Sequence, residues 1–290
     1  MPVHDELGIR MKTYYEQIPK TRLMRRTPVA IRIDGKAFHT FTRGFQKPFD
    51  EVLVKSMQET MKYLCENIQG CVLGYTQSDE ITLILVDYKK LNSAAWFDYE
   101  VQKMCSIAAS MATMAFNKAF EDSLEDFFNK NTHLVEYGTH CQHEFISLEK
   151  EELNSNYIKA IEKGAMFDAR CFNIPKEEVT NLIYWRQLDA TRNSIQMVGQ
   201  AHFSHKELHE KSQSQIQDML FTQKGINWND FPTHLKRGSC CIKEYYYGNI
   251  SESNNGYSIP IKSHWIIDKE IPIFKGEDRK YIDDLVYIGE

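Results

Sequence analysis

Apolar residues along the chain follow two periodicities, which predict longer helices alternating with short strands. Helices are expected where apolar residues recur every three or four positions, over residues 5–24, 48–68 and 94–120. Strands are expected where β-branched and aromatic residues cluster between turn residues, over 29–33, 71–76, 81–86 and 170–174. The polar turn over 77–80 joins the second and third strands into a hairpin.

This order of elements predicts an α+β fold, with four antiparallel strands in one sheet that helices cover on one face. Residues 121–162 are acidic and irregular, and we expect a shorter helix with loops there. We expect residues 1–175 to contain the sheet. Residues 176–290 would form a helical and C-terminal extension that packs with it as one unit.

The extension has its own boundary signals. A helix is expected over 176–203, and Ser204 and Glu207 have the spacing of a capping box. The helical region that begins there would end near Gly225. A strand, a loop and short strands are expected to follow, over 239–247, 251–256 and the remaining residues.

Composition and charge narrow the possible partners. With 290 residues, 42% of them hydrophobic, the chain can bury a large core, which excludes a disordered protein. The formal net charge of −5 argues against binding nucleic acid through bulk positive charge. Residues 1–50 nevertheless hold ten basic and five acidic side chains, against 25 and 35 in the rest. This asymmetry favours a phosphate-rich partner, although a solvated basic helix end would explain it as well.

The cysteines indicate a reducing compartment. The chain has seven, an odd number, without a CxxC pair, so we expect free thiols in a cytoplasmic protein. We expect no signal peptide and no membrane span, because no apolar run approaches about 18 residues. His140-Cys141-Gln142-His143, with His133, suggests zinc, but no second cluster stands at ligand spacing, which disfavours that metal.

Two carboxylates stand at the ends of predicted strands. Asp34 follows the strand over 29–33, and Asp79 lies at the tip of the hairpin. On adjacent strands the two can lie side by side, where they repel each other unless a cation sits between them. Mg²⁺ takes one or two carboxylates with waters and substrate phosphates, and two such ions about 4 Å apart can clamp a phosphoryl transfer. The pair therefore predicts a magnesium site, although simple Asp turns would explain it without a metal.

Other polar groups could surround this pair. Lys47 precedes a predicted helix, so its charge and the helix N-terminal amides could hold a triphosphate. Arg186, Asp189 and Asn193 form a polar stripe on one helix, which a solvated helix face would also explain. The chain has no GxxxxGK(S/T), GxGxxG or GxSxG motif, which argues against P-loop kinases, Rossmann dehydrogenases and α/β-hydrolases.

Six motifs follow one another along the chain: Arg32-Ile33-Asp34-Gly35-Lys36-Ala37-Phe38-His39, Lys47-Pro48-Phe49-Asp50, Gln77-Ser78-Asp79-Glu80, Phe167-Asp168-Ala169-Arg170, Trp185-Arg186-Gln187-Leu188-Asp189 and Lys236-Arg237-Gly238. In order and spacing they resemble the tRNA-His guanylyltransferase family, over about residues 5 to 245. The resemblance implies a palm-like, ferredoxin-like sheet and the addition of nucleotides to the 5′ end of a tRNA. It also implies two Mg²⁺ ions per active site, ATP and GTP or other nucleoside triphosphates as substrates, and a homotetramer built as a dimer of dimers.

The resemblance also implies roles for residues of this sequence. The catalytic carboxylates would be Asp34, Asp79 and Glu80, and the metal ligands Asp34, Gly35 and Asp79. Nucleotide contacts would come from Lys36, Ala37, Phe38, His39, Lys47, Asp50, Ser78 and Lys103. Contacts to tRNA would come from Arg32, Arg186, Gln187, Asp189 and Asn193.

Two departures from the family pattern bear on the reaction. Eukaryotic guanylyltransferases have a HINNLYN motif where this chain has Thr191-Arg192-Asn193-Ser194-Ile195-Gln196-Met197, and Glu100 stands where they tend to be basic. The pattern is similar to bacterial and archaeal guanylyltransferase-like proteins, which extend 5′-truncated tRNAs by copying the opposite strand. We therefore favour template-directed tRNA repair over non-templated addition of G to tRNA-His. A nucleotide cyclase and a non-catalytic RNA-binding palm are more distant alternatives.

Overall fold

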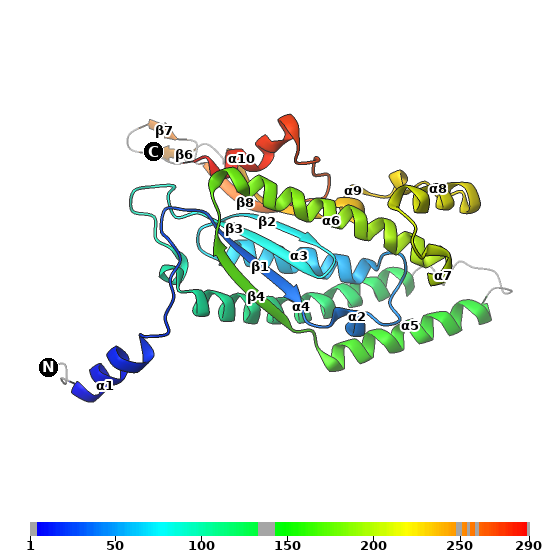
Figure 1. Cartoon of the computed structure of the whole chain (residues 1–290), viewed down its shortest axis with the longest axis horizontal. Coiled ribbons are helices and arrows are strands. Elements are labelled where there is room, and N and C mark those ends of the chain that lie inside the picture. The colour runs from blue at the N-terminus through cyan, green and yellow to red at the C-terminus, as the bar shows by residue number, and fades with distance from the viewer. Residues whose placement is uncertain (1–4, 133–142, 248–250, 254–255, 259–260, 289–290) are drawn as a thin grey trace.

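A six-stranded antiparallel sheet forms the centre of the molecule (Figure 1). The computed structural model describes residues 5–132, 143–247, 251–253, 256–258 and 261–288. The sheet strands are β1 (Val29–Gly35), β2 (Cys71–Gln77), β3 (Glu80–Leu85), β4 (Phe167–Asn173), β5 (Ser239–Tyr247) and β8 (Ile261–Asp268). Their order is β4-β1-β3-β2-β5-β8. All four predicted sheet strands are present, and the α+β, palm-like fold is confirmed.

Helices supply most of the remaining structure. They are α1 (Glu6–Met11), η1 (Lys12–Glu16), α2 (Phe38–Phe41), α3 (Glu51–Asn67), η2 (Trp96–Tyr99), α4 (Val101–Thr132), α5 (His143–Lys163), α6 (Lys176–His202), α7 (His205–Leu208), α8 (Gln213–Lys224), η4 (Trp228–Asp230), α9 (Thr233–Arg237), η5 (Gly276–Arg279) and α10 (Lys280–Val286). A short separate hairpin comprises β6 (Ser251–Ser253) and β7 (Gly256–Ser258). Among the described residues, no helix is both long and apolar enough to cross a membrane.

Helices cover both faces of the sheet, so the prediction of a single covered face was wrong. On one face, Ile31 and Ile33 pack in a core with residues of α3 and α4. On the other, Ala30 joins a second core that includes Ile183 of α6 and Ile282 of α10. Successive side chains of a strand point to opposite faces, so the unbroken apolar run at the start of β1 is the pattern of a strand buried on both sides.

Three predicted elements differ in extent. The N-terminal helix ends at Glu16, because the following chain runs along the body instead, where Leu23 N–H donates to the Tyr99 carbonyl at 3.0 Å. Residues 121–162 are more helical than expected, since α4 continues to Thr132 with Leu124 buried, and α5 follows from His143. The expected loop over 251–256 contains β6 and the start of β7, and the tail ends in the helix α10.

The C-terminal part of the chain completes the same sheet. β5 pairs with β2 and β8 pairs with β5, so residues 176–290 extend the sheet that residues 1–175 begin. The division at residue 175 stays a prediction. The capping box of Ser204 and Glu207 is confirmed, and Gly225 ends α8 in the left-handed conformation.

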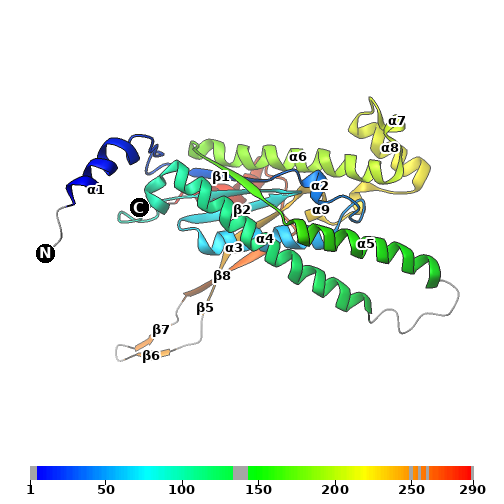
Figure 2. The same ribbon diagram turned by 90° about the horizontal axis from the view of Figure 1, so that it is seen from below.

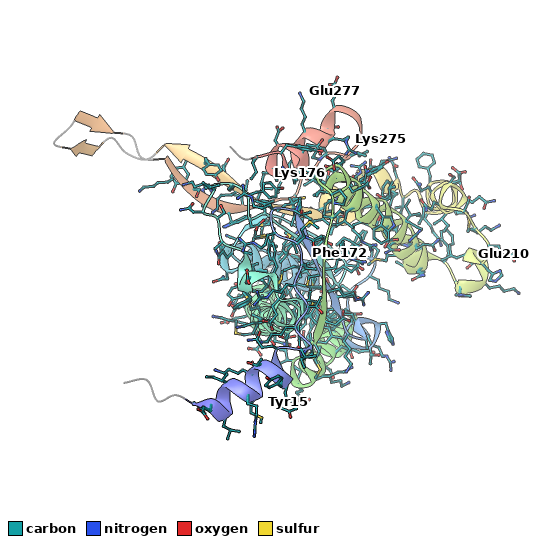
Figure 3. All side chains as sticks on the ribbon, turned by 60° about the vertical axis from the view of Figure 1, so that its left-hand side comes forward. Tyr15, Phe172, Lys176, Glu210, Lys275 and Glu277 are labelled. Carbon is teal, nitrogen blue, oxygen red and sulfur yellow. The ribbon has the colours of Figure 1, made fainter. Side chains whose placement is uncertain are left out.

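Two segments extend from the body. Figure 2 shows the β5 and β8 pair leading outward to the β6–β7 hairpin. The α1–η1 segment also stands apart, and none of its residues is buried. Figure 3 labels Tyr15 on this segment, below the sheet and its covering helices. Of the seven cysteines, the six in the described part of the chain are free thiols, as expected.

Gly74 tests the packing of α3 on the sheet. A Cβ at this position would lie 2.6 Å from Cys65 Sγ and 2.8 Å from Met61 Cγ. Gly74→Ala should therefore cost about 1–3 kcal/mol of unfolding free energy through overpacking, measured by urea unfolding. Gly225→Asn is the control, because nothing lies within 4 Å of that position and Asn tolerates left-handed backbone. Equal losses in the two variants would contradict this account.

Candidate active site

The end of β1 brings acidic side chains together. Antiparallel register places Asp34 opposite Glu80 of β3 on one side and opposite Asp168 of β4 on the other. Asp79 lies in the two-residue turn between β2 and β3. The Gly35 amide donates a hydrogen bond to the Asp79 carbonyl at 3.1 Å. The two carboxylates that the sequence singled out therefore meet at the same end of the sheet.

The electrostatics of this acidic group disfavour its ionised form. Burial raises the pKa of Asp34 above its ordinary value, and the charges of Glu80 and Asp168 raise it further. Burial also raises the pKa of Asp79, and the charges of Asp34 and Glu80 add to that effect, while a hydrogen bond from Ser78 opposes it. A cation between Asp34 and Asp79 would relieve this repulsion.

The donor set fits Mg²⁺ in its usual protein environment. Magnesium prefers hard oxygen ligands and usually keeps several waters and substrate phosphates beside one or two carboxylates. Asp34, Asp79 and the Gly35 carbonyl would be the protein's ligands. Over the described residues, no three or more His, Cys, Asp or Glu side chains cluster closely enough to hold a metal. A magnesium ion here would therefore depend on the substrate for part of its coordination.

Glu80 belongs to an ionic network rather than to this pair alone. Its Oε1 accepts from Arg32 at 2.7 Å, and its Oε2 accepts from Gln77 at 3.0 Å and from Arg186. The Arg186 side chain is only 6% exposed and also pairs with Asp189 at 2.7 Å. Both carboxylate oxygens of Glu80 thus hold neighbouring side chains in place. A catalytic role for Glu80 stays a prediction.

The loop after β1 places most of its predicted nucleotide contacts at the surface. Lys36, Ala37 and His39 are exposed, and Ala37 adopts a left-handed conformation with φ of 54°. Phe38 differs, because its ring is buried against Phe116, with ring centroids 5.5 Å apart. Its packing also requires Gly35, where a Cβ would lie 2.3 Å from the Phe38 ring.

Asp50 and Lys47 stand at the start of α3. The buried Asp50 carboxylate accepts from the amides of Leu53 at 2.8 Å and Gln46 at 3.0 Å, and from the Tyr157 hydroxyl at 2.6 Å. Burial raises the pKa of Asp50, and these hydrogen bonds partly offset that effect. Asp50 therefore caps the helix, whereas the exposed Lys47 lines a neighbouring cavity of about 210 Å³.

A small pocket of about 80 Å³ lies between α3, β2, α6 and α9. Asp50, Ser78 and Asn193 line it, together with apolar side chains such as Met57. Because Ser78 Oγ donates to the Asp79 carboxylate at 3.0 Å, this pocket adjoins the paired carboxylates. The fold thus gathers three residues that the resemblance had placed in nucleotide and tRNA contacts.

Two predicted contact residues lie elsewhere. Gln187 is buried, where its amide donates to the Pro272 carbonyl at 2.7 Å and accepts from the Phe274 amide at 3.1 Å. Lys103 lies at the start of α4, on the sheet face opposite Asp34 and 4.8 Å from the ring of Phe97. The structure brings neither side chain to the carboxylates, so a contact from either stays a prediction.

The basic N-terminal segment is partly used by the fold. Arg22 and Arg25 pair with Asp98, and Arg25 also pairs with Asp87 at 2.5 Å. Arg32 pairs with Glu80 as described above. These ion pairs neutralise part of the local positive charge. The segment therefore has fewer free cations for a phosphate-rich partner than its ten basic residues suggest.

Asp168 and Trp185 stand inside the family motifs, but neither residue was assigned a role at the site from the sequence. The alternation of Phe167, Ala169 and Cys171 would have extended the fourth strand and placed Asp168 opposite Asp34. Trp185 gave no such signal, because its exposure depends on how α6 lies over the sheet. Of the suggested zinc cluster, His133, His140, Cys141 and Gln142 lie outside the described residues.

Comparison with known proteins decides the family. A sequence model described as tRNA-His guanylyltransferase matches residues 9–175, more than half of the chain. The chain belongs to the tRNA-His guanylyltransferase family. A bacterial tRNA-His guanylyltransferase-like protein, solved in complex with ATP, is 38% identical with a TM-score of 0.76, covering 98% of this chain and 100% of that one.

Other members of the tRNA-His guanylyltransferase family agree with this assignment. A structure of a bacterial guanylyltransferase-like protein in complex with GTP is 37% identical with a TM-score of 0.70, again covering 98% of this chain and 100% of that one. The Schizosaccharomyces pombe tRNA-His guanylyltransferase is 24% identical and covers 87% of each chain. The resemblance seen in the motifs is confirmed, and the protein is a nucleotidyltransferase of this family.

The ionic network gives a stability test. Arg186→Met removes the buried cation that the partly buried Glu80 and Asp189 share, although Arg32 and Arg192 stay paired with them. It should therefore cost about 1–3 kcal/mol of unfolding free energy. Arg192→Met is the matched control, because Arg192 pairs with the same Asp189 but is 59% exposed and should cost only about 0–1 kcal/mol. Urea unfolding measures both. Similar costs would show that burial of the Arg186 pair does not matter.

Proposed function

We propose that this protein adds nucleotides to the 5′ end of tRNA in the 3′–5′ direction, copying the opposite strand, and so repairs 5′-truncated tRNA. The observation that carries this proposal is the half-buried pair of Asp34 and Asp79 beside the pocket lined by Asp50, Ser78 and Asn193. Similar bacterial guanylyltransferase-like proteins were solved in complex with ATP and with GTP, which supports nucleotide binding by this chain.

The reaction has two stages, and in each stage one phosphorus–oxygen bond forms as another breaks. An oxygen of the tRNA 5′-phosphate attacks the α-phosphorus of ATP and releases pyrophosphate. The 3′-hydroxyl of an incoming nucleotide then attacks the activated 5′-phosphorus and releases AMP, which leaves a triphosphate at the new 5′ end. Magnesium bound by Asp34 and Asp79 would acidify the attacking hydroxyl and neutralise the triphosphate.

The chain's own residues bind and orient the substrates. Lys36 directly follows β1, and Lys47 lies just before α3. Both side chains are exposed and could pair with the charges of a triphosphate. The pocket beside Ser78 offers an apolar wall for a base and polar groups for its edge. Asp50 holds the start of α3 and thereby the shape of that pocket.

Templating is favoured by the sequence after the Trp185–Asp189 motif. Thr191–Met197 lacks the histidine and the second asparagine of the eukaryotic motif. The chain is also 38% identical to the bacterial guanylyltransferase-like protein, against 24% for the S. pombe tRNA-His guanylyltransferase. Non-templated addition of G to tRNA-His is the alternative that the assay below separates.

We also propose a homotetramer, built as a dimer of dimers, in the cytoplasm. The α1–η1 segment supports self-association, because its apolar side chains Leu7, Ile9 and Met11 are exposed and none of its residues is buried. The free thiols of the described cysteines support a reducing compartment.

An extension assay tests the proposed reaction. Purified protein with ATP, Mg²⁺ and one nucleoside triphosphate at a time is incubated with a tRNA transcript that lacks its first 5′ nucleotide. Only the nucleotide complementary to the facing base should be added, and changing that base should change the nucleotide incorporated. Addition of G regardless of the facing base would indicate the non-templated reaction, and no extension with any nucleotide would refute both.

Asp79→Asn and Asp34→Asn separate catalysis from folding. Each should lower transfer on the order of 10³-fold, because the metal would lose a ligand. The pKa of each native carboxyl is raised, so its ionised form costs stability once the pH rises above the folded pKa. Each Asn variant should therefore melt higher than the metal-free wild type near pH 7, with the difference vanishing at acid pH, where the native carboxyls are protonated.

Thermal unfolding with and without metal completes that test. Added Mg²⁺ should raise the melting temperature of the wild type and should raise that of either Asn variant much less. Wild-type transfer rates in both variants would remove the assignment of the metal pair.

A further inference from the structure

Trp185 differs from the other tryptophans of the chain. The protein has four, and Trp96, Trp228 and Trp265 are 6%, 6% and 8% exposed. Trp185 on α6 is 52% exposed. Single exposed apolar side chains are common on protein surfaces, so the case for Trp185 rests on what surrounds its ring.

Two arginines hold the Trp185 ring in position. The guanidinium carbon of Arg186 lies 4.4 Å from the ring centroid, and that of Arg32 lies 5.4 Å from it. Both arginines are fixed in turn by Glu80, which accepts from each. The ring is therefore oriented before any ligand arrives, while about half of it stays open to solvent.

The open ring stands beside the paired carboxylates. Arg32 and Asp34 are two residues apart on β1 and point to the same face, which separates their Cα atoms by roughly 7 Å. Trp185 contacts the first of these residues. A group stacked on this ring would thus lie within one nucleotide's length of the place where the 5′-phosphate reacts.

Exposed cations flank the same surface. Arg170 of β4 pairs in register with Arg32, and its side chain is 65% exposed. Arg192 lies two turns after Trp185 on α6 and is 59% exposed. Leu188 is also exposed between them on the same helix face. Arg170 and Arg192 pair with Asp168 and Asp189, but both side chains stay more than half exposed. An aromatic ring with exposed cations on neighbouring elements can bind a nucleobase and nearby phosphates.

We propose that Trp185 stacks on a nucleobase at the 5′ end of the RNA substrate, and that Arg170 and Arg192 contact the phosphates beside it. This inference rests on the proposed function, since it names how the same site holds its RNA. RNA is favoured over a free nucleotide because the two cations are exposed on different elements, Arg170 on β4 and Arg192 on α6, rather than gathered in one pocket. Trp185 is thus a positioning residue for the end that reacts.

The location of Trp185 permits a direct measurement of this contact. Because the other three tryptophans are buried, acrylamide quenches mainly the fluorescence of Trp185. Binding of a tRNA transcript that lacks its first 5′ nucleotide should reduce this quenching, and Trp185→Phe should remove the RNA-dependent part of the signal. RNA that binds without changing the quenching would overturn the proposal. If ATP and Mg²⁺ without RNA reduced the acrylamide quenching of Trp185 as much, the assignment to RNA would be overturned.

Kinetics on the same transcript separate stacking from structural support. Trp185→Ala should raise KM for the RNA about 5- to 150-fold, the equivalent of one lost stacking contact of roughly 1–3 kcal/mol, with a much smaller effect on kcat. Trp185→Phe should retain most of the affinity, and Trp185→Leu, which keeps apolar bulk without a ring face, should resemble Trp185→Ala. Equal losses in the Phe and Leu variants, or a loss confined to kcat, would contradict stacking.

Two controls complete the experiment. Phe221→Ala removes an exposed aromatic ring from α8 and should leave KM unchanged. Arg170→Gln should reduce the slope of log K against log salt by about one, whereas Trp185→Ala should leave the slope as it is. The shielding measurement needs no turnover, so RNA-dependent shielding in a protein that extends nothing would refute the proposed function and leave the stacking contact standing.

Discussion

The position of β1 between β3 and β4 is the constraint on which the rest of the structure depends. Because side chains alternate along a strand, the register that sets Asp34 opposite Glu80 also sends Ile31 and Ile33 into one core and Arg32 toward the other face. A shift of one residue would exchange the two faces and bury the charges. Core packing and the acidic site are therefore fixed by the same pairing.

Charge balance follows from that register. One end of the sheet carries four acidic residues, Asp34, Asp79, Glu80 and Asp168. The nearby arginines do not pair with all four. Arg32 and the buried Arg186 engage both oxygens of Glu80. The pKa values of Asp34 and Asp79 are raised, and within the described part of the chain neither carboxylate forms an ion pair with a basic side chain. The nearby arginines therefore stabilise Glu80, and the carboxylate pair of Asp34 and Asp79 favours binding of a divalent cation.

The same arginines connect the carboxylates to the outer surface. Arg32 and Arg186 lie against Trp185, so the network that supports Glu80 also orients an exposed aromatic ring. The net charge of −5 sums over this uneven distribution and does not describe any one surface. It suits a protein that contacts a nucleic acid at few, oriented sites rather than through a broad basic surface.

The sequence by itself determined the strands around Asp34 and Asp79, the hairpin between them and the family, because these depend on local periodicity and on motif spacing. Tertiary structure alone decided which neighbours those residues have. It buried Phe38 and Gln187 in packing roles, placed Lys103 on the opposite sheet face, and brought Asp168 beside Asp34. A side chain's partners depend on register and on how helices lie over the sheet, and those are set by contacts between residues far apart in the chain.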